Sequence, residues 1–148
     1  MIKNLIVGFG GSNDEYKDFI IEQNYIGIDP DLTQFFKNNP ESIKFKTNGQ
    51  IIEDSIDNIK DYYSEPTFST VFSSRCIGRM ANNISDLIDV IVPGGRIKIY
   101  EADEENIETI ISQAKCSFNE ITISISYCND EVIQYSINLI DKCNLGKK

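Results

Sequence analysis

Apolar positions in this chain alternate between short continuous runs and helical stripes, an order that predicts strands separated by helices. Short apolar runs predict five strands, at residues 3–7, 25–28, 43–47, 67–73 and 97–100. Stripes with a spacing of three and four residues predict helices over residues 12–23, 32–40, 52–63, 84–91 and 104–115. Five consecutive strand-helix units indicate a mostly parallel sheet covered on both faces.

The end of the chain departs from this alternation. Residues 121–127 and 133–139 each place an apolar side chain at every second position, which is typical of strands. The polar turn at residues 128–131 is too short for a parallel crossover, so these two strands must be antiparallel neighbours. The predicted fold is therefore an α/β three-layer sandwich whose mostly parallel seven-stranded sheet ends in an antiparallel β-hairpin. We expect one domain over residues 1–143 and a disordered tail at 144–148.

Two loops that follow the first two predicted strands carry the chemistry. The first strand runs into Gly8-Phe-Gly-Gly11, and the second ends at Asp29, 21 residues after Gly8. Glycines allow the backbone to approach a ligand closely, and an acid at the tip of the next strand can accept two ribose hydroxyls. This spacing indicates a site for a nucleoside-bearing cofactor.

Composition narrows the chemistry further. The 148 residues carry a net charge of −9 and include no histidine, which excludes a Ser-His triad, an imidazole base and a His-ligated metal. The acidic balance argues against unaided nucleic-acid binding. The four cysteines form no CxxC pair, so no metal site is expected, and the sequence lacks a signal-peptide pattern or a membrane-length apolar run. We therefore expect a cytoplasmic protein without membrane association.

Several segments together resemble a class I S-adenosylmethionine-dependent methyltransferase, and the resemblance spans nearly the whole chain. They are residues 8–11, 27–30, 68–73 and 92–97 and the terminal hairpin. The resemblance implies S-adenosylmethionine as cofactor, S-adenosylhomocysteine as product, and methyl transfer to an acceptor that the sequence does not identify.

The resemblance also implies site residues. The glycine loop would lie under the methionine and ribose, Asp29 would bind the ribose hydroxyls, and Pro30 would lie near the adenine. Asn48, Gly49 or Gln50 would border the adenine ring. The cofactor-binding residues implied are Gly8, Phe9, Gly10, Gly11, Asp29, Pro30, Asn48, Gly49 and Ser73. Ser74 and Arg75, which follow the fourth strand, would line the reacting centre.

Methyl transfer suits a protein without histidine, because the sulfonium donor is already activated and catalysis depends mainly on positioning and exclusion of water. Where a proton acceptor is needed, Glu101 or Asp103 at the end of the fifth strand is the nearest candidate, with Tyr100 as an orienting hydroxyl. The alternative interpretation of these acids is a solvated loop that caps the following helix.

Two other functions stay open. Ile6 occupies the position where the family usually carries an acid, which favours a catalytically inactive binding or regulatory subunit of the same fold. A nicotinamide-dependent oxidoreductase would need a glycine where this chain has Asn13. The first strand begins at residue 3, whereas relatives have helices before it, so we expect a partner subunit or self-association to supply a lid.

Overall fold

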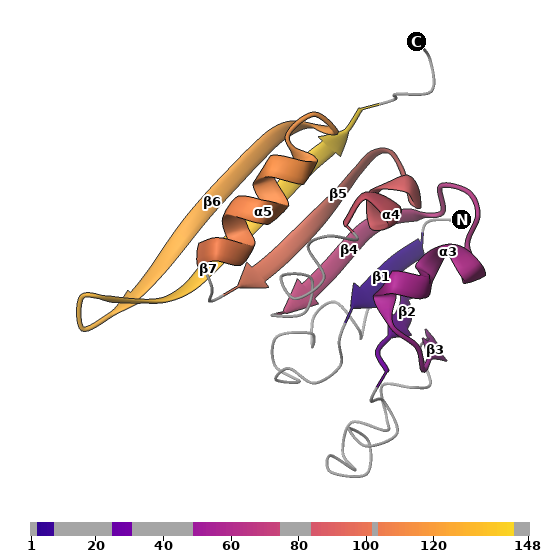
Figure 1. Ribbon diagram of the computed structural model, residues 1–148, viewed down its shortest axis with the longest axis horizontal. Helices are drawn as coiled ribbons and strands as arrows, with labels where there is room; N and C mark the ends of the chain where they lie inside the picture. Colours follow the sequence, from indigo (N-terminus) through magenta and orange to yellow (C-terminus); the bar gives the residue numbers. More distant parts are fainter. Residues whose placement is uncertain (1–2, 8–24, 31–48, 75–83, 102–103, 144–148) are drawn as a thin grey trace.

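The computed structural model describes residues 3–7, 25–30, 49–74, 84–101 and 104–143. Its strands form one seven-stranded sheet (Figure 1). They are β1 Lys3–Val7, β2 Tyr25–Ile28, β3 Gly49–Ile52, β4 Phe68–Ser74, β5 Ile91–Glu101, β6 Phe118–Cys128 and β7 Glu131–Lys142. The described helices are the 3₁₀ turn η2 Ile56–Asn58, α3 Ile59–Tyr62, α4 Ile84–Asp89 and α5 Glu104–Ala114.

The strand order is β3-β2-β1-β4-β5-β7-β6. Strands β1 to β5 pair in parallel, and β7 is antiparallel to both β5 and β6. This confirms the predicted mostly parallel sheet with a terminal antiparallel hairpin. A plain dinucleotide-binding sheet has the order 3-2-1-4-5-6, without an antiparallel strand inserted beside β5.

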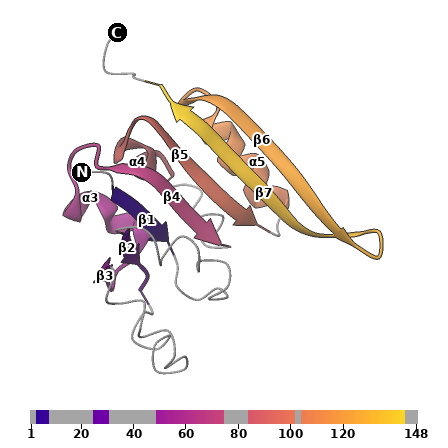
Figure 2. The same cartoon turned by 180° about the vertical axis from the view of Figure 1, so that it is seen from behind.

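The described helices α3, α4 and α5 lie on one face of the sheet (Figures 1 and 2). Side chains at every second strand position point toward this face and form the core with the apolar stripes of the helices. The fully buried core side chains include Leu5, Val71, Ile97, Ile99, Ile137 and Leu139 from the strands and Ile59, Ile110 and Ala114 from the helices. The predicted helices at 12–23 and 32–40, the predicted strand at 43–47 and the tail at 144–148 lie outside the described residues.

β3 pairs with β2 and includes Ile52 as its last residue. The prediction of Ile52 at the start of a helix is therefore wrong. Ile52 is buried in β3, opposite Ile28. The helical segment begins four residues later, because Ser55 caps it: the Ser55 hydroxyl accepts a hydrogen bond from the backbone N–H of Asp57 (3.2 Å). Ile52 and Ile56 are four residues apart, as in a helical stripe, but Ile52 belongs to a strand and Ile56 to the helical segment.

Residues 93–95, with the sequence Pro-Gly-Gly, form an irregularity inside β5. Phe68 pairs with Ile91 and Thr70 with Arg96, so β5 accommodates three more residues than β4 over this stretch. Gly94 adopts a φ of 84°. A Cβ on Gly95 would lie 2.9 Å from the Val92 carbonyl oxygen and 3.0 Å from that of Ser69. Ile91 likewise belongs to β5 and not to the preceding helix.

Replacing these two glycines by alanine tests the two constraints separately. We expect Gly95→Ala to lower the free energy of unfolding by about 3 kcal/mol, because backbone oxygens cannot move aside for the new methyl group. Gly94→Ala meets no atom within 4 Å and should cost only about 1–2 kcal/mol of backbone strain. Urea unfolding of both variants measures the difference; equal losses would contradict this account.

The hairpin is closed by a two-residue turn, where we expected a longer one. Asn129 and Asp130 have φ values of 52° and 65°, as in a type I′ turn, and Cys128 pairs with Glu131. Glu101, the last residue of β5, lies opposite Tyr135. The hairpin therefore extends beyond the carboxyl end of β5 (Figure 1).

The base of the hairpin is fastened to the rest of the sheet. The Lys142 ammonium donates hydrogen bonds to the carbonyl oxygens of Ile88 (2.6 Å) and Ile91 (2.5 Å), at the junction between α4 and β5. Burial lowers the pKa of Lys142, and the charge of Asp89 opposes this shift. The cation is thus held by the carbonyl of Ile88, in the last turn of α4, where helix carbonyls lack intrahelical donors, and by the carbonyl of Ile91 at the start of β5.

Candidate cofactor site

The carboxyl ends of β1, β2, β4 and β5 meet at one edge of the sheet. Val7 pairs with Ile28 of β2 and with Ser73 of β4, and Ser73 pairs with Ile99 of β5. The strand order reverses at β1, whose neighbours are β2 on one side and β4 on the other. Ligands of open α/β sheets bind outside the carboxyl ends of the strands at such a switch point.

Asp29 lies at this edge as predicted, directly after β2. Its backbone N–H donates a hydrogen bond to the carbonyl oxygen of Ile52 (3.2 Å), which fixes the turn that leaves the strand. Asp29 is half-buried and the following Pro30 is exposed. A half-buried acid held by its backbone is suited to accept hydrogen bonds from a diol.

Ser73 and Ser74 end β4 on the other side of the switch point. The Ser73 side chain is fully buried in β4, which lies between β1 and β5. Ser73 can therefore support the wall of a site at this edge but is not exposed to solvent. Ser74 pairs with Tyr100, and Glu101 follows as the last residue of β5. The structure therefore brings Ser74, Tyr100 and Glu101 to the same edge as Asp29.

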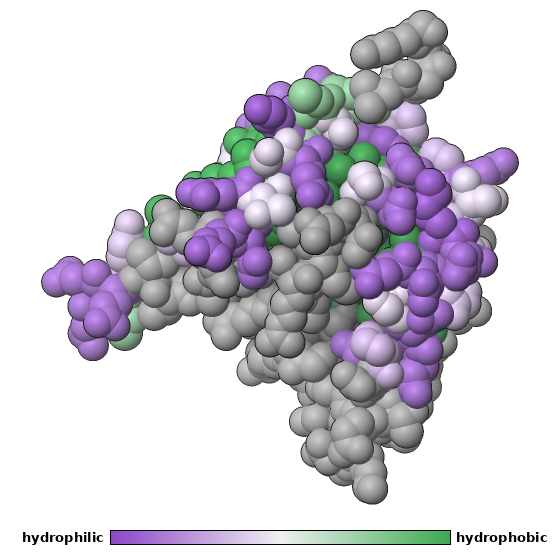
Figure 3. Space-filling view, in the orientation of Figure 1, coloured by the Kyte–Doolittle hydropathy of each residue, from purple (hydrophilic) through white to green (hydrophobic). Residues whose placement is uncertain are grey.

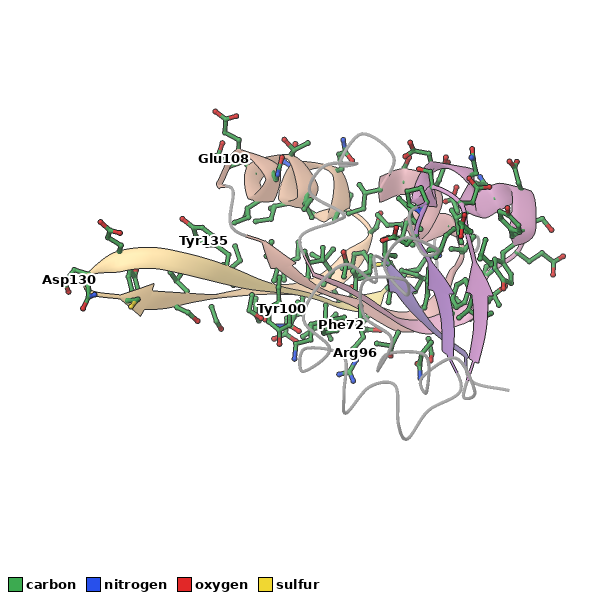
Figure 4. All side chains as sticks on the ribbon, turned by 90° about the horizontal axis from the view of Figure 1, so that it is seen from below. Phe72, Arg96, Tyr100, Glu108, Asp130 and Tyr135 are labelled. Atoms are coloured by element: carbon green, nitrogen blue, oxygen red, sulfur yellow. The ribbon has the colours of Figure 1, made fainter. Side chains whose placement is uncertain are left out.

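Tyr100 lies on the face of the sheet opposite α5 (Figure 4). Its ring packs edge to face on that of Phe72, with centroids 5.5 Å apart and planes at 72°. The Lys98 ammonium lies 5.5 Å from the Tyr100 centroid. These contacts favour one ring orientation and place positive charge beside the tyrosine.

Gly49, predicted at the adenine ring, does not lie at the edge of the sheet where Asp29 lies. Gly49 is the first residue of β3 and pairs with Tyr25, so it lies at the amino end of the strands. Three residues of strand, roughly 10 Å, separate it from the carboxyl end. The residues that directly follow the carboxyl end of β3 are Glu53, which is exposed, and Asp54.

Glu53 and Asp54 were missed because Ile52 was assigned to a helix. The signal was present in the sequence: two β-branched residues, 51 and 52, precede two acids and a capping serine, the pattern of a strand that ends at a helix start. The hydrogen bond from Asp29 to Ile52 places these acids beside the end of β2.

Asp54 is occupied by hydrogen bonds within the chain. Its carboxylate accepts from the backbone N–H of Ser55 (2.7 Å), the Asn58 amide (2.8 Å) and the Tyr62 hydroxyl (2.7 Å). The bonds from Asn58, Tyr62 and Ser55, in that order, lower the pKa of Asp54, and the same contact raises that of Tyr62. Glu53, the other acid that follows β3, is exposed.

The lowered pKa predicts a pH-dependent contribution to stability. The Asp54 carboxylate should stabilise the fold above its ordinary pKa of 3.8, and this contribution should disappear as the pH falls below 3.8 through the lowered value. We therefore expect Asp54→Asn to lower the urea midpoint at neutral pH, and the gap to close in acid. Glu108→Gln on α5 is the matched control; a gap that persists in acid would contradict the prediction.

The remaining predicted site residues, Gly8, Phe9, Gly10, Gly11, Asn48 and Arg75, lie outside the described residues. Within the described part of the chain, no group of three potential metal ligands occurs. Nor do the described ranges contain a helix of the length and apolarity needed to span a membrane.

Solved structures with the same fold are methyltransferases. A predicted O-methyltransferase from Agrobacterium tumefaciens superposes with a TM-score of 0.71 at 12% identity, over 95% of this chain and 74% of its own. A rRNA methylase from Streptococcus thermophilus gives 0.68 at 15% identity, over 97% and 88%. N-methyltransferase NodS from Bradyrhizobium japonicum WM9, in complex with S-adenosyl-L-homocysteine, gives 0.68 at 13% identity, over 95% and 78%.

No protein-family model matches the chain, and no curated protein matches it either. The likeness is therefore one of structure. The strand order, the antiparallel β7 and these superpositions define the class: the chain has the fold of the class I methyltransferases.

Proposed function

We propose that this protein binds S-adenosylmethionine and transfers its methyl group to an acceptor that is still unidentified. The observation that carries the proposal is the position of Asp29, half-buried at the carboxyl end of β2 and beside the switch point between β1 and β4. The fold and the site chemistry agree, because an adenosine placed at this edge presents its ribose diol to the end of β2.

The described residues divide into two groups around the edge. Asp29 and the exposed Glu53 follow β2 and β3, on the side where ribose and adenine would lie. Tyr100 and Glu101 end β5, on the side where the sulfonium and the acceptor would meet. The bound cofactor supplies an electrophilic methyl group, so the protein has to hold an acceptor in line with it and exclude water.

The superposed proteins do not identify the acceptor. Their names include an O-methyltransferase, a rRNA methylase and an N-methyltransferase, so one fold supports different acceptors. In the proposed mechanism a neutral amine acceptor needs no strong base, whereas a hydroxyl would need Glu101 as proton acceptor. A cytoplasmic location and a lid supplied by another subunit remain parts of this proposal.

Calorimetric titration of the purified chain with S-adenosylmethionine, S-adenosylhomocysteine and NAD tests the proposal. We expect both methionine derivatives to bind and NAD not to bind. Binding without methyl transfer to any acceptor tested would favour the alternative, an inactive regulatory subunit of the same fold. Binding of NAD in place of the methionine derivatives would overturn the proposal.

A further inference from the structure

β6 is a long edge strand with an exposed apolar face. It is the last strand in the sheet order, and no other described strand pairs with its outer side. The exposed fractions of Ile123, Ile125 and Tyr127 are 44%, 44% and 62%. Figure 3 shows hydrophobic surface along the rim beside α5, where β6 runs.

The helix above this face is too short to cover it. α5 has eleven residues and spans roughly 16 Å. β6 also has eleven residues but, as a strand, spans roughly 37 Å. Ile121 packs against the core, whereas the apolar positions farther along β6 extend past the helix.

In the described part of the chain, the edge from Glu120 to Ser126 lacks most of the features that usually prevent strand pairing, and a register shift with β7 follows at Tyr127. Natural edge strands are kept short or carry lysine, proline or an inward charge. The other edge strand, β3, is only four residues long. β6 contains no proline or lysine, and Glu120 is its one charged residue. From Glu120 to Ser126 its register with β7 is unbroken.

The sequence of β6 is complementary to itself. Its alternating segment, residues 121–127, has Ser124 at the midpoint. In an antiparallel pair centred there, Ile123 lies opposite the partner's Ile125, and Ile121 opposite the partner's Tyr127. The hydroxyls of Thr122 and Ser126 pair on the other face. Such apolar and hydroxyl cross-strand pairs are stabilising.

Charge makes the β6 edge a more favourable contact for a second copy than the acidic surfaces of the chain. The chain has a net charge of −9, so two copies repel each other wherever acids are close. Residues 121–127 form a segment without any charge, so two copies can meet there without juxtaposing carboxylates.

We propose that two copies of this chain form a symmetric dimer by antiparallel edge-to-edge pairing of β6, with Ser124 at the two-fold axis. The pairing is isologous and uses the β6 edge of each copy, so it closes at two subunits. It joins the two sheets into one and continues the apolar stripe from one subunit to the other. This inference does not depend on the proposed methyl transfer.

Light scattering coupled to size-exclusion chromatography tests the dimer. We expect a mass of twice 16.8 kDa for the full chain and a monomer mass for the double variant Ile123→Glu, Ile125→Glu. The matched control Ser112→Glu, Gln113→Glu adds the same charge to exposed positions of α5 and should remain a dimer. Circular dichroism verifies that each variant is folded.

Cysteine cross-linking tests the register. With the native cysteines replaced by serine, Ser124→Cys places two thiols directly opposite each other at about 4.5–5.5 Å between Cα atoms, which is within disulfide range. Thr122→Cys is the control, because its own copies would be roughly 14 Å apart along the strands. We expect Ser124→Cys to form a disulfide dimer on oxidation and Thr122→Cys not to.

A monomeric wild type, a dimer that survives the glutamate pair, or assemblies larger than two would each overturn the proposal. Efficient cross-linking of Thr122→Cys would overturn the register. A different protein found to occupy the β6 edge in place of a second copy would likewise overturn the homodimer.

Discussion

Asp29→Ala is expected to weaken S-adenosylhomocysteine binding by roughly 10- to 150-fold. The change removes a carboxylate that would accept hydrogen bonds from the ribose hydroxyls, and hydrogen bonds to charged groups contribute about 1.5–3 kcal/mol. Asp29 is half-buried at the end of β2, and its hydrogen bond to Ile52 is made by the backbone N–H, which the alanine variant retains.

Calorimetric titration measures this effect, with Glu108→Ala as control. Glu108 is an exposed acid on α5, so its loss changes the net charge equally but lies on a different element (Figure 4). We expect the control to bind like the wild type. An unchanged affinity in Asp29→Ala would remove the basis of the proposed cofactor site.

Phe68→Ala should produce the largest loss of stability, about 3–5 kcal/mol in the free energy of unfolding. Phe68 opens β4, is fully buried, and packs edge to face against Tyr63 with ring centroids 4.9 Å apart. Its truncation leaves a cavity between α3 and the sheet, where the Val90 carbonyl and the Phe68 N–H also form a hydrogen bond of 2.9 Å.

Urea unfolding of Phe68→Leu provides the comparison, because leucine keeps most of the buried volume. We expect it to lose less than about 2 kcal/mol. Similar losses for the alanine and leucine variants would show that shape complementarity with Tyr63, rather than the cavity, sets the cost.

The sequence predicted correctly those elements in which the apolar positions follow one periodicity. Residues 3–7 and 25–28 are apolar runs between polar segments, and the structure has β1 and β2 at those bounds. The terminal hairpin was predicted from its period of two, and α5 from its apolar stripe. In each case one periodicity applies along the whole element.

The errors arise where two elements meet without a break in the apolar spacing. Ile52 and Ile56 are four residues apart, so a strand end and a helix start looked like one helix. The same effect placed Ile91 in a helix. The third strand was predicted at residues 43–47, so an adenine contact at 48–50 would follow its end, whereas the described β3 begins at Gly49.

Burial on β6 could not be predicted from its alternation. A period of two indicates that a strand has an apolar face, but whether that face is covered depends on the length and position of a helix elsewhere in the chain. The candidate site likewise combines a local and a tertiary feature. Asp29 was predicted at the end of a strand from its spacing to the glycines, whereas its proximity to Glu53 depends on the pairing of β2 with β3.

Within the described ranges, side-chain and backbone hydrogen bonds fasten the hairpin at its base. Lys142 fastens its base to the junction of α4 and β5, and the backbone of Cys143 donates to the carbonyl oxygen of Ser117 (2.8 Å), whereas its tip at Asn129 and Asp130 extends beyond β5. In the isolated subunit, backbone amides near the tip should therefore exchange with deuterium sooner than those at the base, in a gradient of local opening along the two strands.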